Sequence, residues 1–223
     1  MLEPFFVKRN FIGEQGIEMR SIGVFCGANV GINLMYSESA ARLGELMAEQ
    51  GIKLVYGGGN VGLMGVIADA VLAAGGTGIG VIPQSLVDRE VAHRGLQELV
   101  VVETMHERKA IMAARSDAFI AMPGGFGTFD EICEIITWNQ LGIIKKPVAF
   151  YNINGYWDKF FEMIDHTVAE GFVKGDQREN LIVESDAEVL LDRIRLMPIP
   201  HLITGLILRG YKLLVVSCCA LAA

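Results

Sequence analysis

The chain has 223 residues, of which 52% are hydrophobic and 20% are charged. This balance excludes a disordered or fibrous protein and favours a globular one. The formal net charge of −7 argues against nucleic acid as a partner, because the average surface repels a phosphate backbone.

Residues 1–19 are expected to be an N-terminal extension of the folded domain. They lack the apolar stretch of about 7–15 residues that a signal peptide requires, so we expect the protein to stay inside the cell. The four cysteines show no CxxC spacing, and a chain of this length folds without disulfides. Both observations favour a cytoplasmic location.

Residues 20–197 are predicted to form one domain in which strands and helices alternate. Short β-branched runs predict strands at 21–25, 53–56, 78–82, 98–102, 118–122 and 147–151. Apolar residues at three- and four-residue spacing predict helices at 38–49, 62–74, 106–115, 130–140 and 157–170. Strands that are apolar throughout are typical of a parallel sheet covered on both faces. We therefore expect a Rossmann-like, doubly wound α/β fold, with ligands beyond the carboxyl ends of the strands.

The turn after residues 53–56 contains a GxGxxG spacing at Gly57, Gly59 and Gly62. A dinucleotide site also needs an acidic residue about 20 positions later, at the tip of the next strand, to hold the ribose. That strand is expected at 78–82, and the nearest acids, Asp88 and Glu90, lie well past its tip. The turn therefore favours a mononucleotide or sugar-phosphate cradle. Tight turns with close helix packing are the alternative interpretation.

The helix expected after residues 98–102 begins with a cationic pair, Arg108 and Lys109. A planar guanidinium fork beside a point charge can hold phosphate or neutralise charge on a leaving group. A solvated helical face is the alternative. His106 has no second histidine or acid at metal-ligand spacing, so we predict no metal site.

The turn after residues 118–122 is rich in glycine and opens the next helix. Glycines let backbone amides converge, and a helix N-terminus adds unpaired N–H donors, so residues 124–127 are expected to bind phosphate. No Gly-Lys-Ser/Thr follows these glycines, which disfavours a Walker A loop and ATP hydrolysis.

Glu131 has two interpretations. Thr128 and Glu131 have the spacing of a capping box, in which each side chain satisfies a backbone donor of the other residue. A carboxylate beside a phosphate-binding turn is also where a general base for a phosphorylated sugar would stand.

Residues 198–223 are expected to be an apolar C-terminal tail. Arg209 and Lys212 divide it into pieces shorter than a membrane span of about 18–20 residues. We expect the tail to pack on the domain or on a partner rather than to contact a membrane.

Three motifs together resemble the LONELY GUY family of cytokinin riboside 5′-monophosphate phosphoribohydrolases. They are YGGGNVGLMG (56–65), MHERKA (105–110) and PGGFGTFDE (123–131), the last followed by ITWNQLG (136–142). The resemblance implies a Rossmann-like homodimer that needs no cofactor. Its implied reaction hydrolyses the N-glycosidic bond of an N6-modified adenosine monophosphate, releasing the free base and ribose 5-phosphate.

By motif match, the resemblance implies that Arg108 and Glu131 are the catalytic pair. The expected substrate-binding residues are Gly58, Gly59, Glu90, Lys109, Gly124, Gly125, Phe126, Gly127, Thr128 and Thr137. A carboxylate suits the reaction, because cleavage builds positive charge on the ribose and the attacking water must be oriented or deprotonated.

Three other functions compete with this hypothesis. The same phosphate cradle and acid would serve a nucleosidase for AMP or other purine monophosphates. A non-catalytic carrier, similar to molybdenum-cofactor carrier proteins, would use the fold to hold a phosphorylated ligand, but the presence of both Arg108 and Glu131 argues against it. A lysine decarboxylase needs pyridoxal phosphate with a Schiff-base lysine, which the spacing does not indicate.

The homodimer also has an argument from pattern. Helix 130–140 carries Ile132, Ile135, Ile136 and Trp138. We expect these residues to form more apolar surface than one sheet can cover, which fits an isologous dimer.

Overall fold

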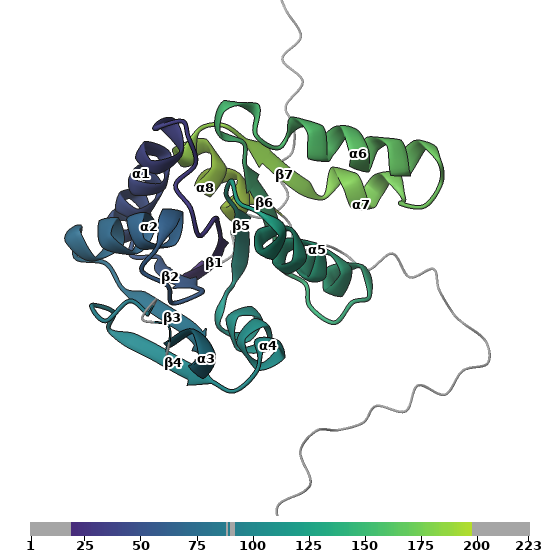
Figure 1. The fold of residues 1–223 in the computed structure, drawn as a ribbon. Helices are drawn as coiled ribbons and strands as arrows, with labels where there is room; N and C mark the ends of the chain where they lie inside the picture. Colours follow the sequence, from purple (N-terminus) through teal and green to yellow (C-terminus); the bar gives the residue numbers. More distant parts are fainter. Residues whose placement is uncertain (1–18, 88, 90–91, 198–223) are drawn as a thin grey trace, which may run out of the picture.

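The computed structural model describes residues 19–87, 89 and 92–197 (Figure 1). The expected N-terminal extension up to residue 18 and the apolar tail from residue 198 lie outside the described residues, as does Glu90.

A seven-stranded sheet forms the centre of the domain, and all its paired strands are parallel. The strands are β1 (Ser21–Phe25), β2 (Lys53–Tyr56), β3 (Gly78–Pro83), β4 (Glu98–Val102), β5 (Ala118–Ala121), β6 (Val148–Tyr151) and β7 (Leu181–Glu184). Their spatial order is β4-β3-β2-β1-β5-β6-β7. The predicted Rossmann-like α/β fold is confirmed, and six of the strands were predicted, while β7 was not.

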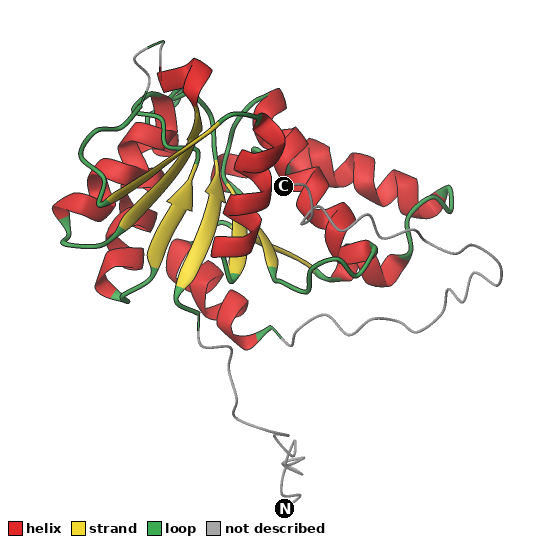
Figure 2. Cartoon of the chain, turned by 90° about the horizontal axis from the view of Figure 1, so that it is seen from below, coloured by secondary structure: helices red, strands yellow, loops and turns green. Residues whose placement is uncertain are grey.

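Helices cover both faces of this sheet (Figure 2). They are α1 (Met35–Glu49), α2 (Gly62–Ala73), α3 (Gln84–Val87), α4 (Met105–Arg115), α5 (Phe126–Gln140), α6 (Asp158–Ala169), α7 (Gly175–Glu179) and α8 (Ala187–Leu196), with a 3₁₀ turn η1 (Ile153–Gly155). Buried residues of α1, α2 and α8 share one core cluster, and those of α4, α5 and α6 share the other.

Successive residues of a strand place their side chains alternately in the two core clusters. In β1, Ile22 and Val24 pack with α1 and α2, whereas Phe25 packs on the opposite face and stacks on Phe119 of β5. Every residue of β1 is buried, while the edge strand β4 is mostly only partly buried. This difference explains why the central strands are apolar throughout, because both of their faces lie under helices.

The chain changes direction between β1 and β5. It runs outward from β1 through β2 and β3 to β4, then returns to place β5 on the other side of β1. Two backbone hydrogen bonds join the strand ends, from Met122 N–H to the Phe25 carbonyl (2.9 Å) and from Gly27 N–H to the Pro123 carbonyl (3.0 Å). The loops beyond these ends diverge to opposite faces, which opens a crevice of the kind where such sheets bind ligands.

Candidate active site

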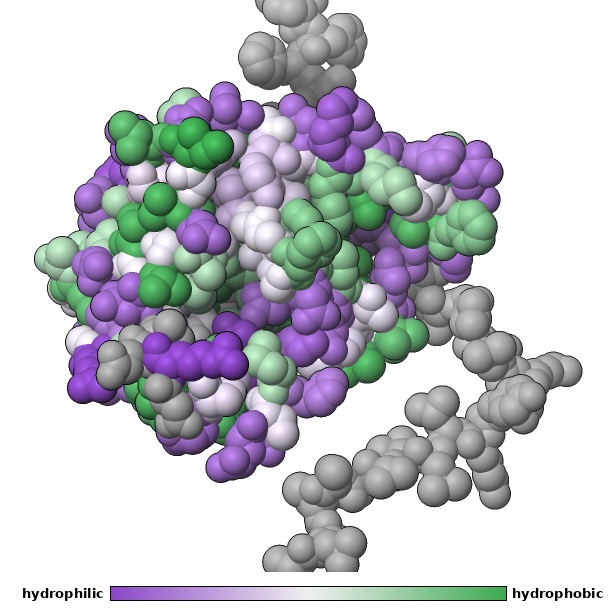
Figure 3. Space-filling view, in the orientation of Figure 1, coloured by the Kyte–Doolittle hydropathy of each residue, from purple (hydrophilic) through white to green (hydrophobic). Residues whose placement is uncertain are grey.

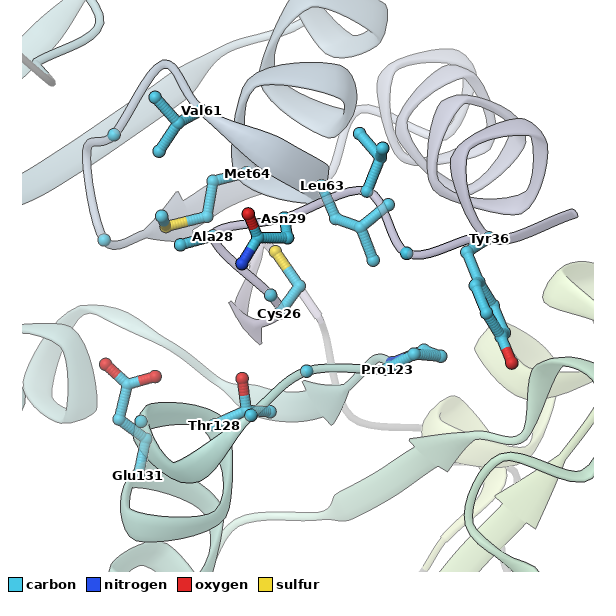
Figure 4. Close-up of a pocket in the computed structure, with 18 of the residues that line it drawn as sticks. Cys26, Ala28, Asn29, Tyr36, Val61, Leu63, Met64, Pro123, Thr128 and Glu131 are labelled. Carbon is cyan, nitrogen blue, oxygen red and sulfur yellow. The ribbon is translucent and has the colours of Figure 1, made fainter. Parts of the chain in front are cut away.

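A cavity of about 560 Å³ lies at this point of the sheet, lined by the loops that follow β1, β2, β3 and β5. The space-filling view shows a hollow near the middle of the face drawn in Figure 3. Figure 4 shows Thr128 and Glu131 on one wall and Val61, Leu63 and Met64 on the opposite wall. Both predicted glycine-rich turns contribute to the lining, so the ligand site expected at the carboxyl edge is present as a cavity.

An ion pair between two helices forms the charged part of the wall. Arg108 Nη1 of α4 lies 3.1 Å from Glu131 Oε1 of α5, and each residue is only 8% exposed. Arg108 Nε also donates to the Val81 carbonyl at 3.1 Å. The alternative interpretation of Arg108 as part of a solvated helical face is therefore wrong.

Gly57 leaves the space that this guanidinium occupies. A Cβ at Gly57 would lie 1.9 Å from Arg108 Nη2, a distance that no side chain allows. The guanidinium thus lies against the bare backbone of the first glycine turn, between the β3 carbonyl and the α5 carboxylate. Close approach of another group, rather than flexibility, explains why glycine stands at this position.

The capping-box interpretation of Thr128 and Glu131 is wrong. Helix α5 begins at Phe126, four residues before the predicted start, and its N-cap is Gly125 without a side-chain cap. A capping box does occur on α4, where Thr104 Oγ1 accepts from Glu107 N–H at 3.1 Å and Glu107 Oε2 accepts from Thr104 N–H at 3.2 Å. Glu131 is therefore free of capping and faces Arg108 and the cavity (Figure 4).

Burial changes the protonation of two groups in the wall. It raises the pKa of Glu131 above the ordinary value of a glutamate, while the neighbouring Arg108 guanidinium acts in the opposite direction. Burial also raises the pKa of the Cys26 thiol far above its usual range. Cys26 therefore lines the cavity as a neutral thiol, and burial makes Glu131 easier to protonate than an exposed glutamate.

The turn at the start of α5 is open to an anion. No atom lies within 4 Å of where a Cβ would stand on Gly125 or Gly127. Gly124 is different, because a Cβ there would lie 2.1 Å from the hydroxyl of the buried Thr128. With no side-chain cap, the first-turn amides of α5 offer hydrogen bonds and a partial positive charge.

The other end of the cavity is largely apolar. Tyr36 stands at that end, away from Glu131 (Figure 4), and packs edge-on against Tyr156 with ring centroids 5.9 Å apart. The Tyr156 hydroxyl donates to the Gly124 carbonyl, which links this end to the turn at the start of α5. Sequence reasoning missed both tyrosines, since neither belongs to a motif: Tyr36 lies in the first turn of α1 and Tyr156 directly follows η1.

Several predicted substrate contacts lie in or beside the cavity wall. Gly59, Gly124, Gly125, Gly127 and Thr128 line it. Gly58 does not appear in the lining of the described residues and shapes the turn with a φ of 71°, where a side chain would be strained. Phe126 is 91% exposed, and its ring packs edge-on against Phe129.

Two other predicted contacts make different interactions. Lys109 Nζ pairs with Asp130 Oδ2 at 3.2 Å and with Glu134 Oε2 at 2.9 Å. Thr137 is exposed, and its hydroxyl donates to the Cys133 carbonyl one turn earlier in α5 at 2.8 Å. Within the described part of the chain, neither side chain lines the cavity.

The apolar residues of α5 do not form the uncovered face that we expected. Ile132 and Ile135 are buried in the core cluster of their own chain, and Ile136 and Trp138 are partly buried against it. Their pattern is explained by the packing of α5 on the sheet, so it no longer argues for a dimer.

Two features are absent from the described residues. No group of three or more His, Cys, Asp or Glu side chains there is arranged to hold a metal ion. None of the helices described has both the length and the apolar character needed to cross a membrane.

Comparison with known proteins gives one consistent group of relatives. A family model described as "possible lysine decarboxylase" matches residues 64–194. The cytokinin riboside 5′-monophosphate phosphoribohydrolase LOG of Oryza sativa subsp. japonica is 48% identical over 179 residues, which cover 80% of this chain and 74% of that protein. The corresponding enzyme LOG2 of Arabidopsis thaliana is 46% identical over 172 residues, covering 77% of this chain and 81% of that protein.

Solved structures share the fold at lower identity. The molybdenum cofactor binding protein from Rippkaea orientalis matches with a TM-score of 0.61 and 24% identity, covering 80% of this chain and 96% of that one. The molybdenum cofactor carrier protein from Chlamydomonas reinhardtii matches with a TM-score of 0.59 and 23% identity, covering 79% and 96%. These likenesses support the same arrangement of sheet and helices.

Proposed function

Because the chain belongs to the LONELY GUY family, we propose that it hydrolyses the N-glycosidic bond of cytokinin riboside 5′-monophosphates. The products are the free N6-modified adenine and ribose 5-phosphate. The observation that carries this proposal is the buried pair of Arg108 and Glu131 on the wall of a cavity that begins at an uncapped helix N-terminus.

The 5′-phosphate binds at the start of α5 in this proposal. The space beside Gly125 and Gly127, where a Cβ would stand, is open, the first turn of α5 has no side-chain cap, and the partial positive charge of the helix end favours a phosphate. This site gives the enzyme a reason to prefer a nucleotide over the corresponding nucleoside.

Glu131 is the proposed general base. Its carboxylate takes a proton from water as the water oxygen bonds to C1′ and the bond from C1′ to the base nitrogen breaks, with the electron pair leaving on the base. The departing base nitrogen then takes a proton from solvent, and Glu131 returns its proton to solvent. The same negative charge stabilises the positive charge that develops on the ribose. Arg108 holds this carboxylate at 3.1 Å and opposes the effect of burial on its pKa, so the ionised form is available for the reaction.

The base and its N6 substituent extend into the apolar part of the cavity. Leu63 and Tyr36 provide apolar surface there, and Val61 and Met64 add apolar side chains on the wall opposite Glu131 (Figure 4). Transfer of an isoprenoid-like substituent from water to such surface is favourable, at about 0.8 kcal/mol per buried methylene. This supports an N6-substituted base over plain adenine.

The remaining residues predicted from the resemblance stay proposals. Lys109 and Thr137 are proposed substrate contacts, although in this structure their polar atoms pair with α5 groups. Homodimer assembly and a cytoplasmic location are likewise proposed from the family resemblance and from the two described cysteines, Cys26 and Cys133, which are both free thiols.

The family model's description as a lysine decarboxylase finds no support in the cavity. None of its lining residues, among those that the structure describes, is a lysine that could form a Schiff base. A carrier of phosphorylated ligands remains the rival from another class and would need no buried acid beside the ligand.

Release of base from three compounds tests the proposal. Purified protein is incubated with isopentenyladenosine 5′-monophosphate, AMP and isopentenyladenosine, and free base is measured by chromatography. We expect release from the first at the highest rate and none from the unphosphorylated riboside. Equal or faster release from AMP would favour a general nucleotide nucleosidase, and no release from any compound would favour the carrier.

A further inference from the structure

A buried histidine lies beside the first glycine turn and has no part in the reaction described above. His93 is 6% exposed, and its backbone N–H donates to the Gly58 carbonyl at 2.8 Å. Its neighbour Ala92 forms an antiparallel bridge with Gly59. Residues 92–95, which we call the strap, therefore run along the turn and are hydrogen-bonded to it.

The imidazole anchors this strap. His93 Nδ1 accepts a hydrogen bond from Gly95 N–H at 3.1 Å, and Nε2 lies 3.0 Å from Asp69 Oδ1 on α2. Because Gly95 already donates to Nδ1, the neutral ring carries its proton on Nε2 and donates it to Asp69. Both ring nitrogens are thus used, one within the strap and one to the helix that follows the turn.

The Arg108 guanidinium packs against the turn that the strap holds. The guanidinium lies so close to Gly57 that a Cβ there would be 1.9 Å from Nη2. On the other side, a Cβ at Gly58 would lie 3.1 Å from Ile82 Cβ. The turn is therefore in close contact with β3 and is hydrogen-bonded to the strap.

We infer that His93 is a positioning residue, which holds the Arg108 guanidinium in place through the strap and the turn at residues 57–59. The inference rests on the proposed function, in which Arg108 orients the catalytic carboxylate. A misplacement of about 1 Å in a catalytic group can cost about 100-fold in rate. Loss of the His93 side chain is thus expected to reduce kcat although it touches no substrate.

Steady-state kinetics with isopentenyladenosine 5′-monophosphate test this role. We compare wild type with His93→Ala, His93→Asn and His93→Gln at a temperature where circular dichroism shows every variant folded. We expect kcat of His93→Ala to fall about 10- to 100-fold with KM changed less than about twofold. His93→Asn keeps an acceptor for Gly95 and His93→Gln keeps a donor for Asp69, so each is expected to recover part of kcat.

The matched control is His166→Asn, which changes an exposed histidine of α6 and is expected to leave kcat unchanged. An unchanged kcat in all three His93 variants, with only a lower Tm, would overturn the inference and leave His93 a purely structural residue. A rise in KM at constant kcat would overturn it too, because the effect would then lie in substrate binding.

A second readout does not depend on activity. The ¹⁵N resonance of the Arg108 Nε–H, assigned by its loss in Arg108→Lys, reports the hydrogen bond to the Val81 carbonyl. It is expected to shift or broaden in His93→Ala and to stay in place in His166→Asn. An unmoved resonance contradicts the inference, whereas a wild type that hydrolyses nothing contradicts only the proposed function.

Discussion

Substitution of Glu131 by glutamine separates a catalytic role from a structural one. Glutamine keeps the size of the side chain and an oxygen that accepts from Arg108 Nη1, now 3.1 Å from the carboxylate. It removes the basic carboxylate, so general-base catalysis is lost and kcat is expected to fall about 10²–10⁴-fold.

The expected cost in stability is small. The still-charged Arg108 guanidinium then donates to a neutral amide oxygen instead of a carboxylate, which costs about 1 kcal/mol and lowers Tm by about 2–4 °C in a domain of this size. Glutamine is neutral, so it avoids the cost of burying a charged carboxylate, which is the cost that raises the pKa of Glu131. This gain offsets part of the loss in stability. Helix capping makes no contribution, because α5 starts at Phe126 with Gly125 as its uncapped N-cap.

Activity and Tm are measured on the same preparation. Glu162→Gln serves as the control, since Glu162 is an exposed glutamate of α6 that pairs with Lys159. The reasoning is refuted if Glu131→Gln keeps more than about a tenth of the wild-type kcat, or if its Tm falls by more than about 10 °C, beyond the range worked out above.

The pH dependence of Glu131 and the two glycine-rich turns give further tests of the site. Because burial raises the pKa of Glu131 above 4.5, a pH–rate profile should show kcat/KM falling as pH drops through a value above that of an ordinary glutamate. The raised pKa also means that the contribution of Glu131 to stability is present at low pH and is lost as pH rises through its folded pKa. Denaturant titrations at several pH values should find this loss in wild type and not in Glu131→Gln. Gly57→Ala should abolish most activity while the protein stays folded, because the new Cβ would lie 1.9 Å from Arg108 Nη2 and displace the guanidinium. Kinetics measure the activity and circular dichroism the folding, and a wild-type kcat would contradict the prediction. Gly124→Ala should lower Tm, because its Cβ would lie 2.1 Å from the buried Thr128 hydroxyl. Gly125→Ala places its Cβ in open space and should mainly raise KM for the nucleotide. Equal changes of Tm and KM in both variants would contradict an open phosphate-binding turn.

Periodicity was sufficient to predict most of the fold. The central strands are apolar on both faces because each face lies under helices, and this pattern is visible without any structure. Strand β7 (Leu181–Glu184) escaped prediction because it is a short edge strand, only partly buried, in a region of mixed polarity.

The start of α5 shows a limit of local pattern. The residues Phe126, Gly127 and Thr128 have the composition of a turn, so the helix was predicted to begin four residues late. That error supported a capping box between Thr128 and Glu131. In the structure the helix begins at Phe126, after a turn of residues 122–125 that follows β5, and Glu131 then lies inside it, facing Arg108.

The candidate site was predicted in its motifs but not in its contacts. Arg108 and Lys109 are neighbours in sequence, yet one pairs with Glu131 in the wall of the cavity and the other pairs with Asp130 and Glu134 outside the lining described. Adjacent helical residues point about 100° apart, and only the position of α5 decides which of them faces the ligand. The contact between Arg108 and Gly57 depends on how closely α4 approaches the turn after β2 in space, which residue spacing in the sequence does not predict.

The central claim is that this cavity cleaves a nucleotide at C1′ with Glu131 as the base. The most direct measurement is product analysis of isopentenyladenosine 5′-monophosphate incubated with wild type and with Glu131→Gln. The account predicts equal amounts of free isopentenyladenine and ribose 5-phosphate from wild type and almost none from the variant. Isopentenyladenosine as the product, or equal base release by both proteins, would contradict it.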